Sequence, residues 1–223
     1  MHTKRLAAMA ATIALAATAT ACGGEDETTP TSTSTTPQEQ TKPAPVAEIP
    51  SLTGKDTAVT LDAGFVDALK QLKLTPSPVG DASISAAGVA SFPITGGNVK
   101  YFTPGTESPY VQGMIDHDGS GLSLTGGGKT VRLTDFVVDP GASVLTGKVT
   151  VDGEEAAASA PLFFLDGRTL KPLESKDDGT AVLEGTTVKL KAEAADLLNQ
   201  TFGVQALQEG LVIGVAKITV DTA

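Results

Sequence analysis

The chain is poor in the residues that most reactive sites and nucleic-acid-binding surfaces require. Its 223 residues include one cysteine, two histidines and no tryptophan, and aromatic residues make up only 4%. A single cysteine excludes an intramolecular disulfide and any metal site built from several thiolates. Sixteen basic residues stand against 26 acidic ones, a net charge of −10. An acidic chain without basic runs lacks the electrostatic footprint of a nucleic-acid-binding protein, so this class is excluded too.

The most continuous apolar run lies near the N-terminus and is too short to span a membrane. Lys4 and Arg5 precede apolar residues 6–17, and small residues then lead to Cys22. A basic start, a short apolar run and a small-residue end are the three parts of a secretory signal peptide. The stretch Ala19-Thr20-Ala21-Cys22-Gly23 resembles the lipobox of bacterial lipoproteins, with Ala19 where leucine is usual.

This resemblance implies that the signal peptide, residues 1–21, is removed and that Cys22 carries the lipid, including acyl chains such as palmitate. The same residues also satisfy the cleavage rule of an ordinary signal peptide, which would leave an unpaired thiol on an exported protein. Several acyl chains anchor a protein stably, because each buried CH₂ contributes about 0.8 kcal/mol. We therefore predict a lipoprotein on the extracytoplasmic face of the cell membrane, with the membrane as its partner through Cys22.

Residues 22–50 contain Cys22 and a spacer. From Gly23 to Pro50 there are seven threonines, five prolines and no aromatic residue. Such a segment cannot bury enough apolar surface to offset its ordering entropy, which predicts a disordered linker. Residues 51–223 hold all the aromatic residues, and their length suits one well-cored extracytoplasmic domain.

The pattern of this domain is mainly that of strands. Short β-rich runs occupy residues 59–61, 89–94, 122–124, 131–133, 144–151, 162–165, 182–183, 188–190 and 211–220. Glycine-containing turn signals lie between them, at residues 96–97, 126–128, 152–153, 166–167 and 178–179. Many short strands at this spacing predict a mainly β fold, an antiparallel sandwich or a barrel-like sheet.

Two short helices interrupt the strands. Residues 62–73 place apolar side chains at helical spacing behind Asp62, which can cap the helix, and residues 192–202 repeat this spacing. Segments 57–76 and 186–205 also align with each other, each with a V-x-L strand followed by a helix. Either a duplicated strand–helix unit or coincidence explains this alignment.

Two polar stretches imitate known binding loops. Ser123 to Thr130 approaches the phosphate-binding pattern, but strand-like residues follow its glycines where that motif requires a helix, which predicts a hairpin turn. Asp116 to Gly121 begins like a calcium loop, yet Gly127 stands where the bidentate glutamate is needed. We expect a polar turn there, with a weak calcium site as the alternative.

His117 is the one histidine that remains after removal of the signal peptide. It is interpreted either as an exposed loop histidine between Asp116 and Asp118 or as a single axial ligand of a haem iron, with Tyr101 or Tyr110 nearby. One imidazole cannot build the usual catalytic zinc site, and no nucleophile–base motif accompanies it. The inventory predicts no catalytic residues and no enzyme.

The second interpretation of His117 is supported by a resemblance. Four motifs follow one another over about residues 85–165: Phe92 to Gly97, Gln112 to Leu122, Val131 to Phe136, and Leu145 to Gly147. Their order resembles that of the secreted haem-uptake domains of the HtaA type. The resemblance implies a β-rich domain that takes haem, with His117 in the place of the family's histidine. The family's N-terminal segment carries a tyrosine ligand, whereas residues 62–73 contain no tyrosine.

Three functional hypotheses follow, in this order. The first is a membrane-anchored surface lipoprotein whose domain is a binding or structural module, with a small ligand or a cell-envelope partner and no cofactor. The alternative is a haem-binding or haem-uptake surface protein that uses His117. The third, a secreted enzyme, is disfavoured because the residue inventory assembles no catalytic constellation.

Overall fold

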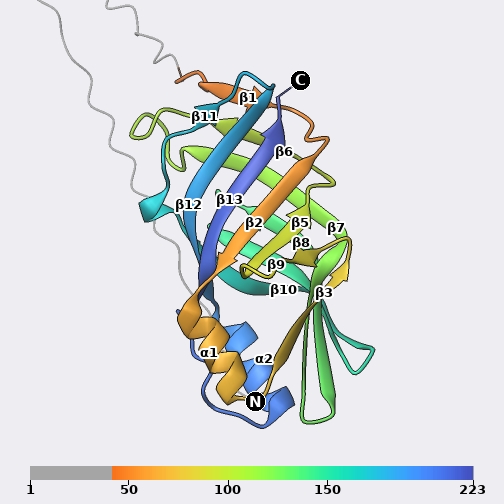
Figure 1. The fold of residues 1–223 in the computed structure, drawn as a ribbon. Coiled ribbons are helices and arrows are strands. Elements are labelled where there is room, and N and C mark those ends of the chain that lie inside the picture. The colour runs from red at the N-terminus through yellow and green to blue at the C-terminus, as the bar shows by residue number, and fades with distance from the viewer. Residues whose placement is uncertain (1–41, 223) are drawn as a thin grey trace, which may run out of the picture. The chain divides into compact units, whose positions relative to one another are not determined.

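The computed structural model describes residues 42–222, and these form a mainly antiparallel β structure with two helices (Figure 1). The strands are β1 Ala47–Ile49, β2 Lys55–Leu61, β3 Thr75–Gly80, β4 Ser83–Ile84, β5 Val89–Pro93, β6 Gly96–Tyr101, β7 Val111–Gly126, β8 Lys129–Asp139, β9 Val144–Val151, β10 Glu154–Asp166, β11 Glu174–Ser175, β12 Thr180–Leu190 and β13 Val212–Asp221. The helices are α1 Ala63–Gln71 and α2 Ala192–Phe202, and a 3₁₀ turn, η1, spans Gly167–Thr169. The predicted signal peptide and Cys22 lie outside the described residues.

The described strands belong to one sheet that curls around itself into a half-barrel (Figure 1). Its order is β1-β6-β7-β8-β9-β10-β12-β13-β2-β5-β4, with β3 paired to β7 and β11 paired to β12. Every pairing between these strands is antiparallel. The predicted fold class is therefore confirmed, in its barrel-like form.

Both helices lie at one end of the curled sheet (Figure 1). The carboxylate of Asp62 accepts hydrogen bonds from the amides of Gly64 and Phe65 at 2.8 and 3.2 Å, which fixes the start of α1 as predicted. Helix α1 buries Leu69, and α2 buries Leu198, in the common core. Within the residues that the structure describes, no helix is long and apolar enough to cross a bilayer.

The two strand–helix units occupy related places. Strands β2 and β12 both pair with β13, antiparallel to it, so they run in the same direction and lead into α1 and α2 at the same end of the sheet. The chain then differs between the units, because α1 leads to β3 whereas α2 leads to β13 itself. This placement agrees with a repeated strand–helix unit up to the end of each helix.

The structure confirms one of the predicted glycine turns and contradicts another. The glycines after Ser123 form the predicted hairpin turn between β7 and β8, with Gly126 paired to Lys129. Gly96 and Gly97, predicted to form a turn, instead begin β6, where Gly97 lies too close to the backbone of Met114 for any side chain. A side chain at Gly97 would collide with that strand, which explains the glycine without a turn.

The prediction of a polar turn from Asp116 to Gly121 is also wrong. It is not a polar turn but part of the long strand β7, with a bulge where the register shifts between His117 and Gly121. The bulge uses its polar groups internally: the amide of Gly119 donates to Asp135 at 2.9 Å, and the hydroxyl of Ser120 donates to the carbonyl of His117 at 3.1 Å.

The predicted spacer ends in ordered structure. Residues Ala47–Ile49 form β1 and pair with β6, and the amide of Val46 donates to the carbonyl of Tyr101 at 2.7 Å. The predicted domain boundary at residue 51 falls after this strand. Backbone pairing with β6 therefore orders this short segment although Val46, beside it, is mostly exposed.

Candidate functional site

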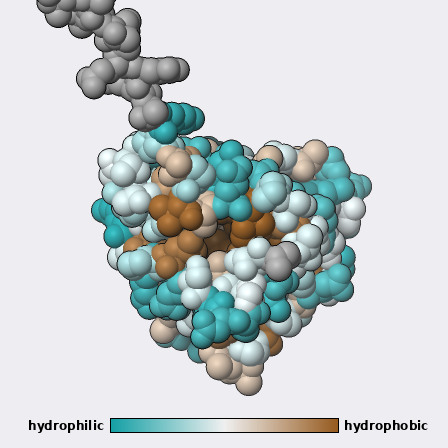
Figure 2. Space-filling model, turned by 90° about the horizontal axis from the view of Figure 1, so that it is seen from above, coloured by the Kyte–Doolittle hydropathy of each residue, from teal (hydrophilic) through white to brown (hydrophobic). Residues whose placement is uncertain are grey.

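A large apolar pocket opens at the end of the sheet away from the helices. Figure 2 views the domain from above Figure 1 and shows a hollow flanked by hydrophobic side chains. Its volume is about 1010 Å³, at the upper end of the roughly 300–1,000 Å³ of typical ligand sites. The lining comes from both halves of the curled sheet, from β1, β2 and β5 to β13.

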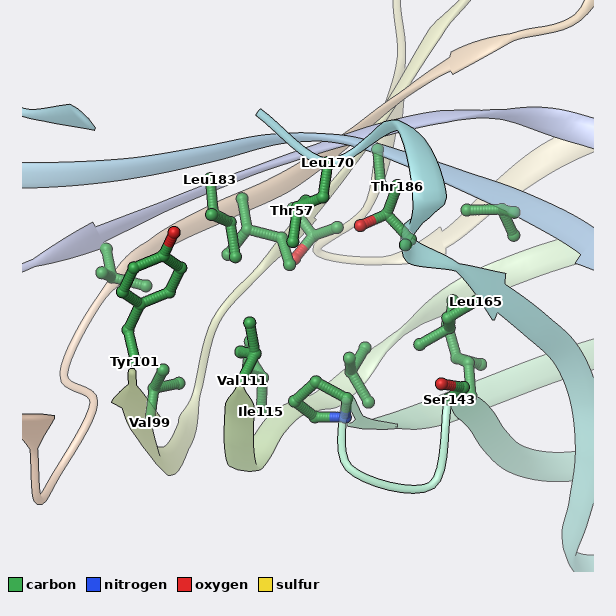
Figure 3. Close-up of a pocket in the computed structure, with 18 of the residues that line it drawn as sticks. Thr57, Val99, Tyr101, Val111, Ile115, Ser143, Leu165, Leu170, Leu183 and Thr186 are labelled. Atoms are coloured by element: carbon green, nitrogen blue, oxygen red, sulfur yellow. The ribbon is translucent and has the colours of Figure 1, made fainter. Parts of the chain in front are cut away.

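The two halves of the sheet face each other across this pocket. In Figure 3, Val111 and Ile115 of β7 point towards Leu183 and Thr186 of β12. Leu170, from the segment after η1, also points into the space. The pocket is therefore bounded by mostly apolar side chains on opposite walls.

His117 lies in the wall of this pocket and is almost completely buried. Only 1% of its surface is exposed. Along β7 the side chains of Val111, Ile115 and His117 lie on the same face, because successive strand residues alternate between faces. The interpretation of His117 as an exposed loop residue is therefore wrong, and the alternation with Val111 and Ile115 was the signal that could have shown it.

The hydrogen bonds of His117 determine the state of its ring. Nδ1 lies 2.9 Å from the carbonyl oxygen of Pro93, which can only accept, so Nδ1 carries the proton. Nε2 lies 3.2 Å from Oγ1 of Thr57 and accepts a hydrogen bond from that hydroxyl when the ring is neutral. Burial lowers the pKa of His117 below its ordinary value, against smaller opposing effects of Pro93 and Asp116. The imidazole is therefore neutral at pH 7, with its lone pair on Nε2.

Tyr101 and Tyr110 belong to the same pocket. Tyr101 is 7% exposed, and its hydroxyl points into the cavity (Figure 3). Tyr110 packs edge-on against Tyr101, with ring centroids 6.0 Å apart and planes at 88°. Burial, and to a smaller extent the neighbouring phenol of Tyr101, raises the pKa of Tyr110. The phenol of Tyr110 is therefore protonated at neutral pH and offers a hydroxyl group rather than a charge.

A buried carboxylate organises the charges in the lining. The Asp166 side chain is 8% exposed and accepts hydrogen bonds from Nε and Nη2 of Arg168 at 2.9 and 2.6 Å. Nζ of Lys189 donates to the same carboxylate at 2.8 Å. These two cations hold the pKa of Asp166 far below its usual range, so it stays ionised. The arrangement fixes Arg168 at the pocket, with 82% of its side chain open to solvent.

The structure thus brings together three residues singled out in the sequence, His117, Tyr101 and Tyr110, as parts of one pocket lining. Cys22 lies outside the described residues, so its lipidation stays a prediction. Thr57 and Arg168 were missed, and no local pattern marks them: Thr57 meets His117 across 60 residues of sequence, through tertiary structure alone.

No cation site accompanies the acidic segment around His117. Within residues 42–222, no three histidine, cysteine or acidic side chains are grouped so that they could hold a metal ion. The carboxylate of Asp135 is engaged by the amide of Gly119.

Comparison with known proteins adds information on the fold. No family model matches this chain, and no curated protein matches it. Among solved structures, the chain is similar to the C-terminal domain of HtaA from Corynebacterium glutamicum, with a TM-score of 0.54 at 13% identity over 77% of this chain and 98% of that domain. The N-terminal domain of HtaA gives 0.48 at 14% identity, covering 77% of this chain and 99% of that one. A heme-binding protein of the same organism, HtaB, gives 0.45 at 10% identity, covering 78% and 96%.

The first of these likenesses shows a shared fold. It extends the HtaA-type resemblance from about 80 residues in the middle of the sequence to most of the chain, and it confirms that resemblance at the level of the fold. At this identity the comparison says nothing of the ligand, which has to be argued from the pocket.

Proposed function

We propose that this protein is a haem-binding surface module, without catalytic activity, that holds haem in the pocket between the two halves of its sheet. The observation that carries the proposal is the neutral imidazole of His117, buried in the wall of an apolar cavity of about 1010 Å³. Haem combines large apolar faces with an iron that takes an axial nitrogen or oxygen ligand, so it matches both features. The HtaA-type motifs and fold support the same ligand.

His117 is prepared for this role by its second nitrogen. The bond from Nδ1–H to the carbonyl of Pro93 fixes the ring orientation and makes Nε2 more basic, as is usual for histidines that bind metals. Thr57 now donates to Nε2, so its hydroxyl must turn away before Nε2 can bind iron. Tyr101 presents its hydroxyl to the same cavity and is the second candidate ligand, while Tyr110 supports its ring. Haem, when bound, would supply iron as the acceptor of an axial ligand.

The proposed location follows from the N-terminal sequence. Acylation of Cys22 would anchor the domain at the extracytoplasmic face of the membrane, with the threonine- and proline-rich residues as a tether. Mass spectrometry of the protein extracted from membranes tests this part: a lipid adduct on Cys22 supports it, and an unmodified or absent Cys22 in the mature protein overturns it.

Absorbance titration tests the haem proposal. Ferric haem added to purified residues 42–223 should give a saturable Soret band at one equivalent, and His117→Gln should weaken binding and shift the band. Glutamine is chosen because its amide can still meet Pro93 and Thr57, so the variant is expected to fold. Circular dichroism of each variant verifies folding.

A second probe separates iron coordination from apolar burial. Iron-free protoporphyrin IX has the same ring but no axial coordination, so its binding should be the same in wild type and His117→Gln. A flat titration with both porphyrins overturns the proposed function. Haem binding with a Soret band that is indifferent to His117→Gln removes His117 as the ligand, and the same titration of Tyr101→Phe then tests the second candidate.

A further inference from the structure

We propose that Arg168 and Lys176 form a carboxylate subsite at the edge of the pocket, so that the bound ligand carries its anionic groups at that edge. This inference rests on the proposed function and deepens it, because it assigns an orientation to the haem. Haem bears two propionates on one edge and apolar substituents on the opposite edge.

The charges of the lining leave two cations available to an anionic ligand. Apart from His117, Tyr101 and Tyr110, the ionisable side chains that line the pocket are Glu48, Asp166, Arg168 and Lys176. Glu48 is paired with Lys100 at 2.9 Å, and Asp166 is shared by Arg168 and Lys189. Lys100 and Lys189 do not line the pocket but neutralise its two carboxylates, so Arg168 and Lys176 remain as the cations of the lining, in a domain whose residues 51–223 have 13 basic and 21 acidic residues.

Arg168 is held in place at the pocket. Its Nε and Nη2 are bound by the buried carboxylate of Asp166, whose ionisation is maintained by Lys189 as well. A guanidinium has five N–H donors, so the side chain still has donors for a second carboxylate. Because 82% of its side chain is exposed, these remaining donors of Arg168 are accessible to a carboxylate of the ligand.

The pocket lining has an apolar part and a charged part. His117 is 1% exposed and lies among aliphatic side chains, whereas Arg168 and Lys176 belong to the segment between β10 and β12 that borders the pocket. Asp178, two residues after Lys176, is engaged by the hydroxyl of Thr180 at 2.6 Å and does not line the pocket. A ligand that is apolar at one edge and doubly anionic at the other therefore fits in one orientation.

The test compares ferric haem with its dimethyl ester, in which both propionates are masked. Wild type should bind haem more tightly than the ester, and Arg168→Gln should weaken haem binding about fivefold while leaving ester binding unchanged. Lys176→Gln should act in the same direction and does not disturb Asp166. Added salt should weaken haem binding more than ester binding.

Lys171→Gln is the matched control. Lys171 lies in the same segment and is bound to Glu184 at 2.7 Å, but it does not line the pocket. Its replacement by glutamine changes the net charge of the protein by the same amount as Arg168→Gln. Equal affinity of wild type for haem and ester overturns the subsite, as does an equal effect of Arg168→Gln and Lys171→Gln. Failure of wild type to bind either porphyrin overturns the proposed function itself.

Discussion

The two ends of the curled sheet are built from the same strands and filled in different ways. At one end α1 and α2 insert Leu69 and Leu198 into the core. At the other end Leu183 and Val111 face an open cavity (Figure 3). Apolar side chains at the first end stabilise the fold by packing against each other, whereas those at the second end are available to a ligand. The comparison implies that stability and ligand binding can be changed separately.

The largest expected effect is at the helix end. Leu69 is 2% exposed, so Leu69→Ala removes buried methyl groups and leaves a cavity, which should lower the free energy of unfolding by about 3 kcal/mol. Urea denaturation measures this loss. Haem titration of the folded variant should still reach one equivalent with the wild-type Soret maximum. Loss of haem binding by the folded variant would show that the two ends are not independent.

The converse substitution fills the pocket. Leu183→Trp places an indole ring in the cavity. Because the ring enters open space and does not overpack a closed core, the free energy of unfolding should change by less than about 1 kcal/mol. Haem affinity should fall at least about tenfold, because the ring occupies the ligand's space. Val215→Trp is the control, since Val215 is exposed on β13, and it should leave both quantities unchanged. Tight haem binding by Leu183→Trp would place the ligand elsewhere.

A smaller effect is the pH dependence that His117 gives to the pocket end. Burial lowers the pKa of His117, so the folded state takes up a proton less readily than the unfolded chain. In the unfolded chain the histidine titrates at about pH 6.5. The stability is therefore complete above this pH and decreases as the pH falls from it through the folded-state pKa. The slope is at most about 1.4 kcal/mol per pH unit. Urea unfolding of wild type should show this decrease, and unfolding of His117→Gln should not; parallel profiles would contradict it.

The helices were predictable because their information is local. Residues 192–202 were predicted as a helix and are one, and residues 62–73 contain α1 at 63–71. Apolar spacing and a capping aspartate act within a few turns, so neither depends on distant parts of the chain. The same holds for the hairpin turn after Ser123.

The long strands and the pocket depend on distant partners. Only residues 122–124 of β7 were predicted as a strand, because its bulge brings polar residues into the middle of a 16-residue strand. Thr57 and His117 meet because β2 and β7 lie on opposite halves of the sheet. A cavity is also the space that no side chain fills, and no motif encodes it. The sequence could indicate His117 as a candidate, but the pocket around it required the tertiary structure.

The position of β13 between β2 and β12 has a consequence for the order of folding. Gly214 of β13 pairs with Leu61 of β2, so one edge of β2 stays unpaired until a strand more than a hundred residues later in the chain joins the sheet. One edge of β12 depends on the same strand. Contacts of such long range form slowly, and unpaired strand edges are sites of aggregation. Until residues 212–221 join the sheet, the folding chain therefore has two open edges, which a chaperone that holds extended chains is well suited to protect.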